Sequence, residues 1–351
     1  MPVKIHEKYI NRCIQLAQNG LGRTYPNPVV GSVIVHNDAI IGEGWHQKAG
    51  EPHAEVNAVN SVKDKSLLSK STIYVSLEPC SHYGKTPPCS NLIIDSGIKK
   101  VIIGTADPFS EVAGKGIKKL MDAGCEVRVG VLEKECRELN KRFFTFHTKQ
   151  RPYIILKWAQ SSDGFLAPLP LKNAERKPVW ITGKYTQQLV HKWRSEEQAI
   201  MVGTNTAVAD NPKLNTRLWQ GNNPVRIVLD RTLRIPQDSH LFDGSVKTIV
   251  LTENPSEKIL PKNVIFETLN FQEDLAQQVC EILFRHEIQS VIIEGGRETL
   301  QTFIDTNLWD EARIFTGKPH FREGIKAPEA FGSLASETRV DEDHLKIILN
   351  D

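Results

Sequence analysis

The 351-residue sequence has no long apolar run and no marked excess of charge of either sign. Lys and Arg number 44 and Asp and Glu number 42, so the formal net charge is only +2. Proteins that coat nucleic acid usually carry a clear basic excess, and this balance argues against that class. No apolar run approaches the roughly 18 residues that would predict a membrane span. The first seven residues also lack the apolar stretch of a secretory signal, so we expect a cytoplasmic protein.

A disulfide framework is also not predicted. The six cysteines are spread over a long chain without a secretory signal, a setting in which thiols stay reduced. We expect most of them to be buried thiols. Cys80 and Cys89 are the exceptions, because they lie in a segment of prolines and polar residues.

The length predicts two domains, at roughly 150 residues per domain. The first half alternates strand-like and helix-like stretches, which predicts a three-layer α/β/α domain with helices on both faces of a sheet. We expect its helices near 4–18, 53–62, 90–96, 113–123 and 133–146, and its strands near 29–35, 40–41, 72–76, 101–104 and 127–129.

The second half repeats the α/β pattern, and the two halves share no internal sequence repeat. We expect its strands near 153–158, 199–203, 225–229, 248–251, 290–294 and 311–316, and its helices near 185–194, 273–286 and 297–306. The segment Lys149-Gln150-Arg151-Pro152 ends a helix and restarts the chain as a strand. The sequence therefore predicts domains at 1–149 and 150–351.

The most informative local pattern is a histidine, a carboxylate and two cysteines. His53-Ala54-Glu55 is followed by Glu78-Pro79-Cys80 and, after eight intervening residues, by Cys89. One imidazole and two thiolates form the three-ligand set of a catalytic zinc ion, whose fourth position holds water. Zinc lowers the pKa of that water, and a nearby carboxylate can then move protons without binding the metal. Zinc nucleobase deaminases have this H-x-E…P-C signature, so we expect Glu55 to act as the acid–base.

A structural zinc site is the main competing interpretation. Such a site normally has a fourth protein ligand, and His82 could supply it. The spacing of His53 and Glu55 also sets a condition, because residues two apart in a regular helix point about 200° away from each other. The two side chains can therefore face one site only if His53 lies at the very start of a helix.

The second half lacks the G-x-G-x-x-G pattern of a standard dinucleotide fold. A predicted strand instead ends at Glu294-Gly295-Gly296, directly before a helical stretch. Paired glycines let a phosphate approach the N-terminus of a helix, although a tight strand-to-helix turn is the commoner meaning of the pattern.

Several stretches together resemble the bifunctional deaminase–reductases of riboflavin biosynthesis, over essentially the whole chain. They lie at 25–31, 42–46, 50–55, 77–89, 156–164, 180–182, 203–212 and 294–296. The gap of eight residues between Cys80 and Cys89 is typical of this family, whereas editing and cytidine-type deaminases usually have C-x-x-C. The resemblance implies a cytidine-deaminase-like α/β/α domain followed by a dihydrofolate-reductase-like α/β domain.

In the first domain, the resemblance implies a zinc-dependent pyrimidine deaminase. It assigns the zinc ligands to His53, Cys80 and Cys89, and the catalytic proton shuttle to Glu55. The residues implied to bind the pyrimidine and its ribose phosphate are Asn27, His46, Lys85 and Thr86, with Asp107 at the edge of the same site. The flexible ammonium of Lys85 suits a phosphate partner.

In the second domain, the resemblance implies an NADPH-dependent reductase. The residues implied to contact the cofactor are Ala159, Trp180, Thr206, Asp210, Gly296, Arg297, Glu298, Thr299, Leu300, Gln301 and Thr302. Those implied on the substrate side are Lys157, Arg194, Leu214, Arg217 and Glu294. Arg194 and Arg217 would hold the substrate phosphate, which a guanidinium fork suits well.

The chain departs from the family pattern at three places. The segment 166–178 is longer and richer in proline than the usual link, and Pro178 stands where a serine often contacts substrate. Arg231 replaces a small hydroxyl residue often found near the cofactor. The segment 316–324 matches the last strands of the family only loosely.

Two consecutive reactions are implied. The first is hydrolytic deamination of 2,5-diamino-6-ribosylamino-4(3H)-pyrimidinone 5′-phosphate, and the second is reduction of the ribosyl side chain to give 5-amino-6-(5-phospho-D-ribitylamino)uracil. We expect one zinc ion per chain, a small phosphorylated pyrimidine as substrate, no nucleic-acid or membrane partner, and a homo-oligomer, either a dimer or a tetramer. The rival hypotheses are a tRNA-type zinc deaminase with an accessory domain and a non-catalytic protein with structural zinc.

Overall fold

The fold comes from a computed structural model that describes residues 3–83, 87–109, 114–169, 179–255 and 261–350. The chain divides into two compact units, Met1–Gln150 and Arg151–Asp351. This division falls one residue after the boundary expected from the sequence.

The first unit is built on a five-stranded sheet with the order β2-β1-β3-β4-β5. Its strands are β1 (Gly31–His36), β2 (Ala39–Trp45), β3 (Thr72–Leu77), β4 (Lys100–Thr105) and β5 (Glu126–Val129). β1 is antiparallel to β2 and β3, while β3, β4 and β5 run parallel. The carboxyl ends of β3 and β4 therefore meet at one edge of the sheet.

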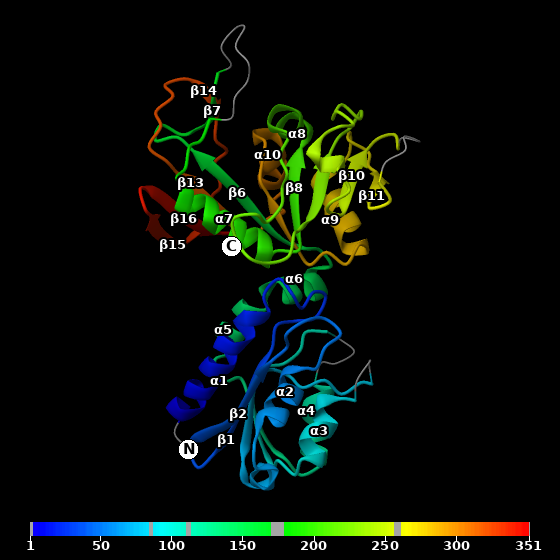
Figure 1. The fold of residues 1–351 in the computed structure, drawn as a ribbon, viewed down its shortest axis with the longest axis vertical. Helices are drawn as coiled ribbons and strands as arrows, with labels where there is room; N and C mark the ends of the chain where they lie inside the picture. The colour runs from blue at the N-terminus through cyan, green and yellow to red at the C-terminus, as the bar shows by residue number, and fades with distance from the viewer. Residues whose placement is uncertain (1–2, 84–86, 110–113, 170–178, 256–260, 351) are drawn as a thin grey trace. The chain divides into compact units, whose positions relative to one another are not determined.

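Helices cover both faces of this sheet, as Figure 1 shows. They are α1 (Val3–Ala17), α2 (Ala54–Ser61), α3 (Cys89–Asp95), α4 (Lys115–Asp122), α5 (Glu133–Leu139) and α6 (Lys141–Lys149), with short 3-10 turns at Gln18–Gly20 and Lys65–Lys70. The apolar face of α1, including Tyr9, Cys13 and Leu16, packs with α5 on one face of the sheet. α2, α3 and α4 share a core on the other face. The expected three-layer α/β/α arrangement is confirmed.

One expected helix, 133–146, is wrong because the structure has two helices there. The break falls at Asn140, which lies between α5 and α6. The Asn140 side chain donates from Nδ2 to the carbonyl of Val29 at 2.9 Å and accepts the Val29 N–H on Oδ1 at 2.9 Å. This pairing with a distant backbone segment holds Asn140 outside regular helical geometry.

The second unit is built on a nine-stranded sheet with the order β11-β10-β9-β8-β12-β6-β13-β16-β15. Its strands are β6 (Tyr153–Gln160), β8 (Ala199–Gly203), β9 (Val225–Leu229), β10 (Thr248–Thr252), β11 (Val264–Thr268), β12 (Ser290–Ile293), β13 (Glu311–Thr316), β15 (Ser333–Val340) and β16 (Asp343–Leu349). Seven of them run parallel, and the hairpin of β15 and β16 is antiparallel. A separate pair joins β7 (Phe165–Pro168) to β14 (Gly324–Lys326).

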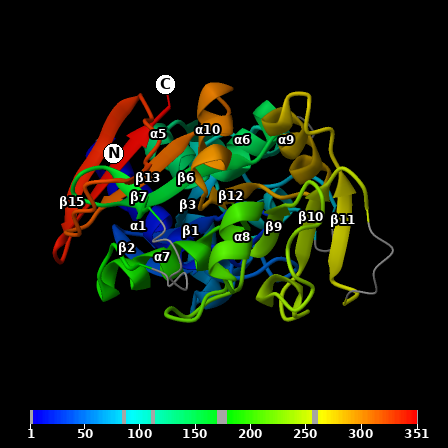
Figure 2. The ribbon, with the colours of Figure 1, turned by 90° about the horizontal axis from the view of Figure 1, so that it is seen from above.

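The helices of this unit also lie on both faces of its sheet, as Figure 2 shows. They are α7 (Lys184–Glu196), α8 (Thr204–Asp210), α9 (Leu275–Arg285) and α10 (Arg297–Asp305), with a 3-10 turn at His240–Phe242. α9 and α10 pack on one face, while α7 and α8 pack on the other. In open parallel sheets, ligands bind outside the carboxyl ends of the strands. Those ends of β6, β8 and β12 carry several of the predicted site residues.

Several elements were not predicted from the sequence: β7, α8, β11, β14, β15 and β16. β15 is an edge strand that is exposed along most of its length, so its sequence lacks the apolar alternation of a half-buried strand. Among the described residues, no helix is both long and apolar enough to cross a membrane.

Candidate active sites

Three predicted metal ligands meet at one point in the first unit. The ligand atoms of His53, Cys80 and Cys89 all lie within 4.8 Å of one another. The Nδ1 atom of His53 is 3.6 Å from the Cys80 sulfur and 3.4 Å from the Cys89 sulfur. Nδ1 is therefore the nitrogen that faces the two thiols.

Local backbone structure places each of these side chains. His53 is the cap residue immediately before α2, with an extended backbone (ψ 167°), and Glu55 lies in the first turn of that helix. This meets the condition that the spacing of the pair imposes. Cys89 is the first residue of α3, and its N–H donates to the Cys80 sulfur at 3.3 Å. Cys80 follows β3 and the intervening Glu78-Pro79.

Glu55 is the titratable group that the structure buries against this cluster. Its side chain is only 3% exposed. Burial, followed by the nearby charge of Cys80, raises the pKa of Glu55 to about 7. A carboxyl group with that pKa can both accept and release a proton near neutral pH.

Of the two thiols, Cys80 is the one that the surroundings make acidic, while its hydrogen bond and burial raise the pKa of Cys89. Hydrogen bonding from Cys89, with further help from His53, lowers the pKa of Cys80 to about 4. Thiolate and imidazole are the ligands that zinc prefers, and a catalytic zinc site has three protein ligands. The donor set therefore fits a catalytic zinc ion.

The structural-zinc interpretation needs a fourth ligand, and the described residues do not provide one. The cluster that could hold a metal contains His53, Cys80 and Cys89, but not His82. His82 is exposed to solvent.

Two predicted substrate-binding residues lie beside the cluster and contact each other. The Nε2 atom of His46 is 3.0 Å from the Asn27 side-chain nitrogen, and its Nδ1 is 3.2 Å from the Pro52 carbonyl. The carbonyl can only accept, so Nδ1 carries the proton and Nε2 accepts from Asn27. The ring of His46 lies 5.2 Å from that of His53, edge to face. Asn27 is thereby oriented next to the metal ligands.

The remaining predicted deaminase residues have different positions. Lys85 and Thr86 lie outside the described residues. Asp107 follows β4, and its Oδ1 accepts the N–H of Phe109 at 2.8 Å. Burial raises the pKa of Asp107 to about 6.

Glu78 is a residue of this region that sequence reasoning missed. Its buried carboxylate accepts backbone N–H groups at 2.9 to 3.2 Å from Asp107, Gly114, Gly116 and Ile117. These bonds tie the start of α4 and the backbone of Asp107 to the segment that carries Cys80. The position of Glu78, two residues before a predicted ligand, was the available signal.

A second cluster of charges lies at the carboxyl ends of β6 and β12 in the second unit. Arg194 donates from Nε and Nη2 to the two carboxylate oxygens of Glu294 at 3.1 and 2.7 Å. Lys157 lies 4.0 Å from the same carboxylate. Burial alone would raise the pKa of Glu294, but Arg194 and then Lys157 lower it to about 2. Burial also lowers the pKa of Lys157.

The segment predicted to bind the cofactor begins directly after Glu294 in the sequence. Gly295 has φ +126°, a conformation that side chains rarely adopt, and Gly296 caps α10. A Cβ on Gly296 would lie 3.2 Å from Thr206 Oγ1 at the start of α8. The N-termini of α8 and α10 and the backbone of Gly295 and Gly296 thus lie together at the ends of β8 and β12. This is the arrangement in which a phosphate can approach free N–H groups.

The other predicted cofactor residues are of several kinds. Leu300 is fully buried in the core. Trp180 is 65% exposed. The rest lie on β6, at the end of α8 and along α10, namely Ala159, Asp210, Arg297, Glu298, Thr299, Gln301 and Thr302.

The predicted substrate residues Leu214 and Arg217 share one loop. Leu214 is 1% exposed and packs in the core. Arg217 is exposed. Arg194 uses its third guanidinium nitrogen, Nη1, to bind the Asn215 carbonyl at 3.3 Å, so its fork is already occupied within the protein.

One of the departures from the family pattern can also be placed. Arg231 pairs with Glu253 at 2.8 Å and lies over the ring of Phe271. Pro178, with most of the 166–178 segment, lies outside the described residues.

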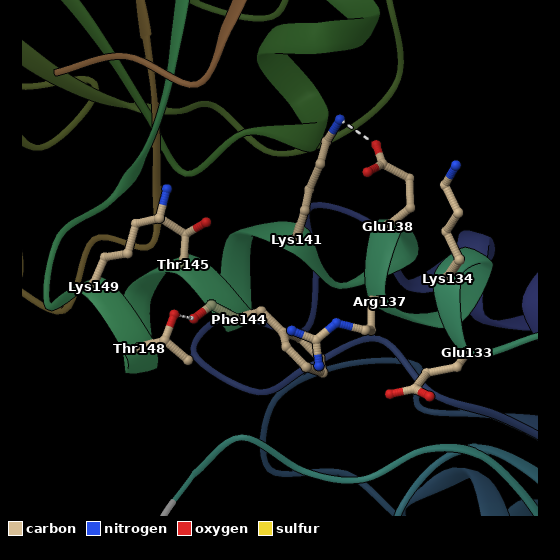
Figure 3. Close-up of a pocket in the computed structure, with 9 residues that line it drawn as sticks. All are labelled: Glu133, Lys134, Arg137, Glu138, Lys141, Phe144, Thr145, Thr148 and Lys149. Carbon is tan, nitrogen blue, oxygen red and sulfur yellow. Dashed lines mark hydrogen bonds and ion pairs between the residues drawn. The ribbon is translucent and has the colours of Figure 1, made fainter. Parts of the chain in front are cut away.

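A surface pocket of about 650 Å³ lies elsewhere in the first unit, along α5 and α6 (Figure 3). Lys141 pairs with Glu138 at 2.6 Å, and the Arg137 guanidinium lies 4.5 Å from the centre of the Phe144 ring. None of the predicted site residues lines this pocket.

Comparisons with known proteins agree with both units. Residues 3–105 match the family model for the cytidine and deoxycytidylate deaminase zinc-binding region, and residues 152–346 match that for the RibD C-terminal domain. The riboflavin biosynthesis protein RibD of Aquifex aeolicus is 40% identical over 327 residues, covering 92% of this chain and 89% of the relative. That of Actinobacillus pleuropneumoniae is 44% identical over 297 residues, covering 82% and 77%.

A solved structure extends the similarity to the whole chain. The crystal structure of a diaminohydroxyphosphoribosylaminopyrimidine deaminase/5-amino-6-(5-phosphoribosylamino)uracil reductase from Thermotoga maritima has a TM-score of 0.90 to this chain. The two are 35% identical, and the match covers 100% of both chains.

Proposed function

Because the chain belongs to the RibD family of riboflavin-biosynthesis deaminase–reductases, we propose that it catalyses two consecutive reactions on one phosphorylated pyrimidine. The first is deamination of 2,5-diamino-6-ribosylamino-4(3H)-pyrimidinone 5′-phosphate. The second is NADPH-dependent reduction of the ribosyl side chain to 5-amino-6-(5-phospho-D-ribitylamino)uracil. We assign the deaminase to residues 1–149 and the reductase to 150–351, an assignment that the division after Gln150 supports.

One observation carries the deaminase half. A buried carboxyl group, Glu55, has a pKa raised to about 7 and lies beside a His-Cys-Cys cluster that fits zinc. A zinc ion would be held by His53, Cys80 and Cys89, and it would supply a water activated near neutral pH. Glu55 would take the proton that this water releases as its oxygen bonds to the ring carbon. It would then deliver protons to the pyrimidine ring and to the exocyclic nitrogen, which leaves the same carbon as ammonia.

Asn27 and His46 fit a role in orienting the pyrimidine. The hydrogen bond from the Asn27 amide to His46 leaves the amide oxygen of Asn27 available to accept from an amino group. Lys85, Thr86 and Asp107 remain the proposed contacts to the rest of the substrate.

In the reductase half, bound NADPH would supply the hydride for reduction at C1′ of the ribose. The backbone at Gly295 and Gly296 and the start of α10 would hold the cofactor phosphates, since they offer N–H groups without side chains in the way. Glu294 stays ionised and fixes both Lys157 and Arg194. Lys157 is thereby held where it can hydrogen-bond to the sugar, and Arg217 supplies an exposed cation for its phosphate.

The partners follow from this chemistry. A few cationic side chains at the site are enough to bind one small phosphorylated substrate, so the chain needs no net basic charge. We therefore propose that it has no nucleic-acid partner. We also propose a homo-oligomer, a dimer or a tetramer, which light scattering coupled to size-exclusion chromatography would measure. Cytoplasmic location remains part of the proposal.

The test is an assay of each half-reaction with zinc quantified. Removing zinc with a chelator should abolish deamination, while reduction of the already deaminated substrate, followed by NADPH oxidation, should continue. Adding zinc back should restore deamination. If chelation abolished reduction as directly as deamination, or if NADPH oxidation did not saturate with substrate, the proposed division of work between the two units would be wrong.

A further inference from the structure

A buried histidine in the second unit contacts the loop that carries Arg217. His191 lies on α7, one turn before Arg194, and is only 3% exposed. Its Nδ1 atom is 3.1 Å from the backbone nitrogen of Arg217, which donates its N–H to the ring. The histidine is therefore bonded to the backbone of the residue proposed to bind the substrate phosphate.

This bond defines the state of the ring. An N–H donor requires an unprotonated Nδ1, so His191 is neutral and carries its proton on Nε2. The surroundings favour that state, because burial, followed by the charges of Arg194 and Arg217, lowers the pKa of His191 to about 4. The histidine thus acts as a fixed hydrogen-bond acceptor at physiological pH.

The same loop is held at neighbouring positions. Arg194 binds the Asn215 carbonyl from the same helix, and the N–H of Thr216 donates to the Asn223 side chain at 2.8 Å. The fully buried Arg226 of β9 donates to the Lys213 carbonyl at 2.9 Å. These contacts leave little freedom to the backbone from 213 to 216, and the bond to His191 extends that restraint to Arg217.

We propose that His191 is a positioning residue of the reductase, which sets the place of the Arg217 guanidinium for the phosphate of the substrate. The inference rests on the proposed function, since it takes the phosphorylated substrate from there. His191 acts through the backbone of Arg217 and contacts no reacting atom. Its loss should therefore affect substrate binding much more than the reduction step.

The experiment compares His191→Leu, which removes the acceptor, with His191→Asn, whose amide oxygen can replace Nδ1. For His191→Leu, KM for the phosphorylated substrate should rise about tenfold, the effect of losing one well-placed hydrogen bond. The kcat should change less than about threefold on the same scale, because the reacting groups stay in place. His191→Asn should recover most of the KM, and Gln188→Leu, an exposed site on the same helix, serves as the control.

A double variant separates positioning from a general loss of structure. In an Arg217→Ala background, His191→Leu should raise KM no further, because the group it positions is gone. Additive effects of the two substitutions, or a KM rise as large for the dephosphorylated substrate, would overturn the proposal. So would a fall in kcat with unchanged KM.

A direct measurement distinguishes failure of this inference from failure of the proposed function. The nitrogen chemical shifts of His191 in the labelled full-length protein should show a neutral ring protonated on Nε2. A ring protonated on Nδ1 would refute the positioning role even in an active reductase. The expected tautomer in a protein without reductase activity would instead count against the proposed function.

Discussion

Two buried glutamates, one in each unit, have pKa values shifted in opposite directions. Glu55 is raised to about 7, because burial dominates and a cysteine lies near. The Glu294 side chain is 9% exposed, and Arg194 and Lys157 lower its pKa to about 2. The same side chain is thus able to exchange a proton in the first unit and is a permanent anion in the second.

This difference indicates two kinds of catalysis. Hydrolytic deamination moves several protons, and a group that titrates near neutral pH serves that purpose. Reduction by a nicotinamide needs positioning and fixed charge more than a titrating acid. Titratable groups whose environments push their pKa values apart reveal how the roles are divided.

The largest effect should come from Glu55→Gln, which removes the titrating group. We expect deamination to fall by about a thousandfold, within the range for general acid–base groups. Zinc content, measured by mass spectrometry, should stay at one ion per chain, because Glu55 is not a ligand. Reduction of the deaminated substrate should be unchanged.

Glu51→Gln is the matched control for Glu55→Gln, since Glu51 lies four residues earlier and is exposed. It should retain full activity in both assays. Deamination that survived in Glu55→Gln would show that the proton-transfer role belongs elsewhere.

Glu294→Gln should have the next largest effect, and on the opposite unit. Removing one partner of a buried ion pair leaves Arg194 and Lys157 without a counter-charge. This should lower the free energy of unfolding of the second unit by about 3 kcal/mol. Five of the six tryptophans lie in the second unit, so tryptophan fluorescence during urea unfolding reports mainly on it. Deamination should be unaffected. If Glu294→Gln were as stable as the unmodified protein, the charges of Arg194 and Lys157 would not need the Glu294 carboxylate.

Glu78→Gln sharpens the comparison within the first unit. Glu78 is a buried anion like Glu294, but it is compensated by backbone N–H groups rather than by cations. A glutamine keeps one acceptor oxygen but presents an amide donor to the same N–H groups. This mismatch should lower the free energy of unfolding of the first unit by about 2 kcal/mol. The urea midpoint for loss of deaminase activity should fall, while the fluorescence transition of the second unit stays in place. Unchanged midpoints for both would contradict this account.

The deaminase cluster was predictable because its residues are close in sequence. His53 and Glu55 are two residues apart, and Cys80 and Cys89 lie in one loop and the helix after it. One histidine and two cysteines already favour zinc as the metal. The structure adds that His53 is the cap residue of α2, which the sequence did not determine. Glu78 was missed because its partners are backbone groups of a distant segment, which leave no pattern in the sequence.

The reductase cluster was predictable only by resemblance. Lys157, Arg194 and Glu294 come from three elements far apart along the chain, and no spacing rule connects them. His191 could have been noticed, since it lies three residues before Arg194 on a predicted helix and so shares its face. The bond of its ring to the Arg217 backbone depends on how the 211–224 loop folds, which local pattern does not determine.

The smallest effect should be a pH dependence of stability in the second unit. The pKa of His191 is lowered to about 4 in the folded chain, from the ordinary value of 6.5. The unfolded state therefore binds a proton first, and stability is lost as the pH falls from about 6.5 toward 4. By pH 5 this loss should amount to about 2 kcal/mol. His191→Asn has no titrating group at this position, so its free energy of unfolding should lack this part of the pH dependence. Glu294 is depressed to about 2, so its own stabilisation is lost only below its unfolded value of 4.5. Urea unfolding followed by tryptophan fluorescence between pH 7 and pH 5 therefore measures the contribution of His191 without that of Glu294. If the free energy of unfolding depended on pH equally in the unmodified protein and in His191→Asn, the pKa of His191 would not be lowered.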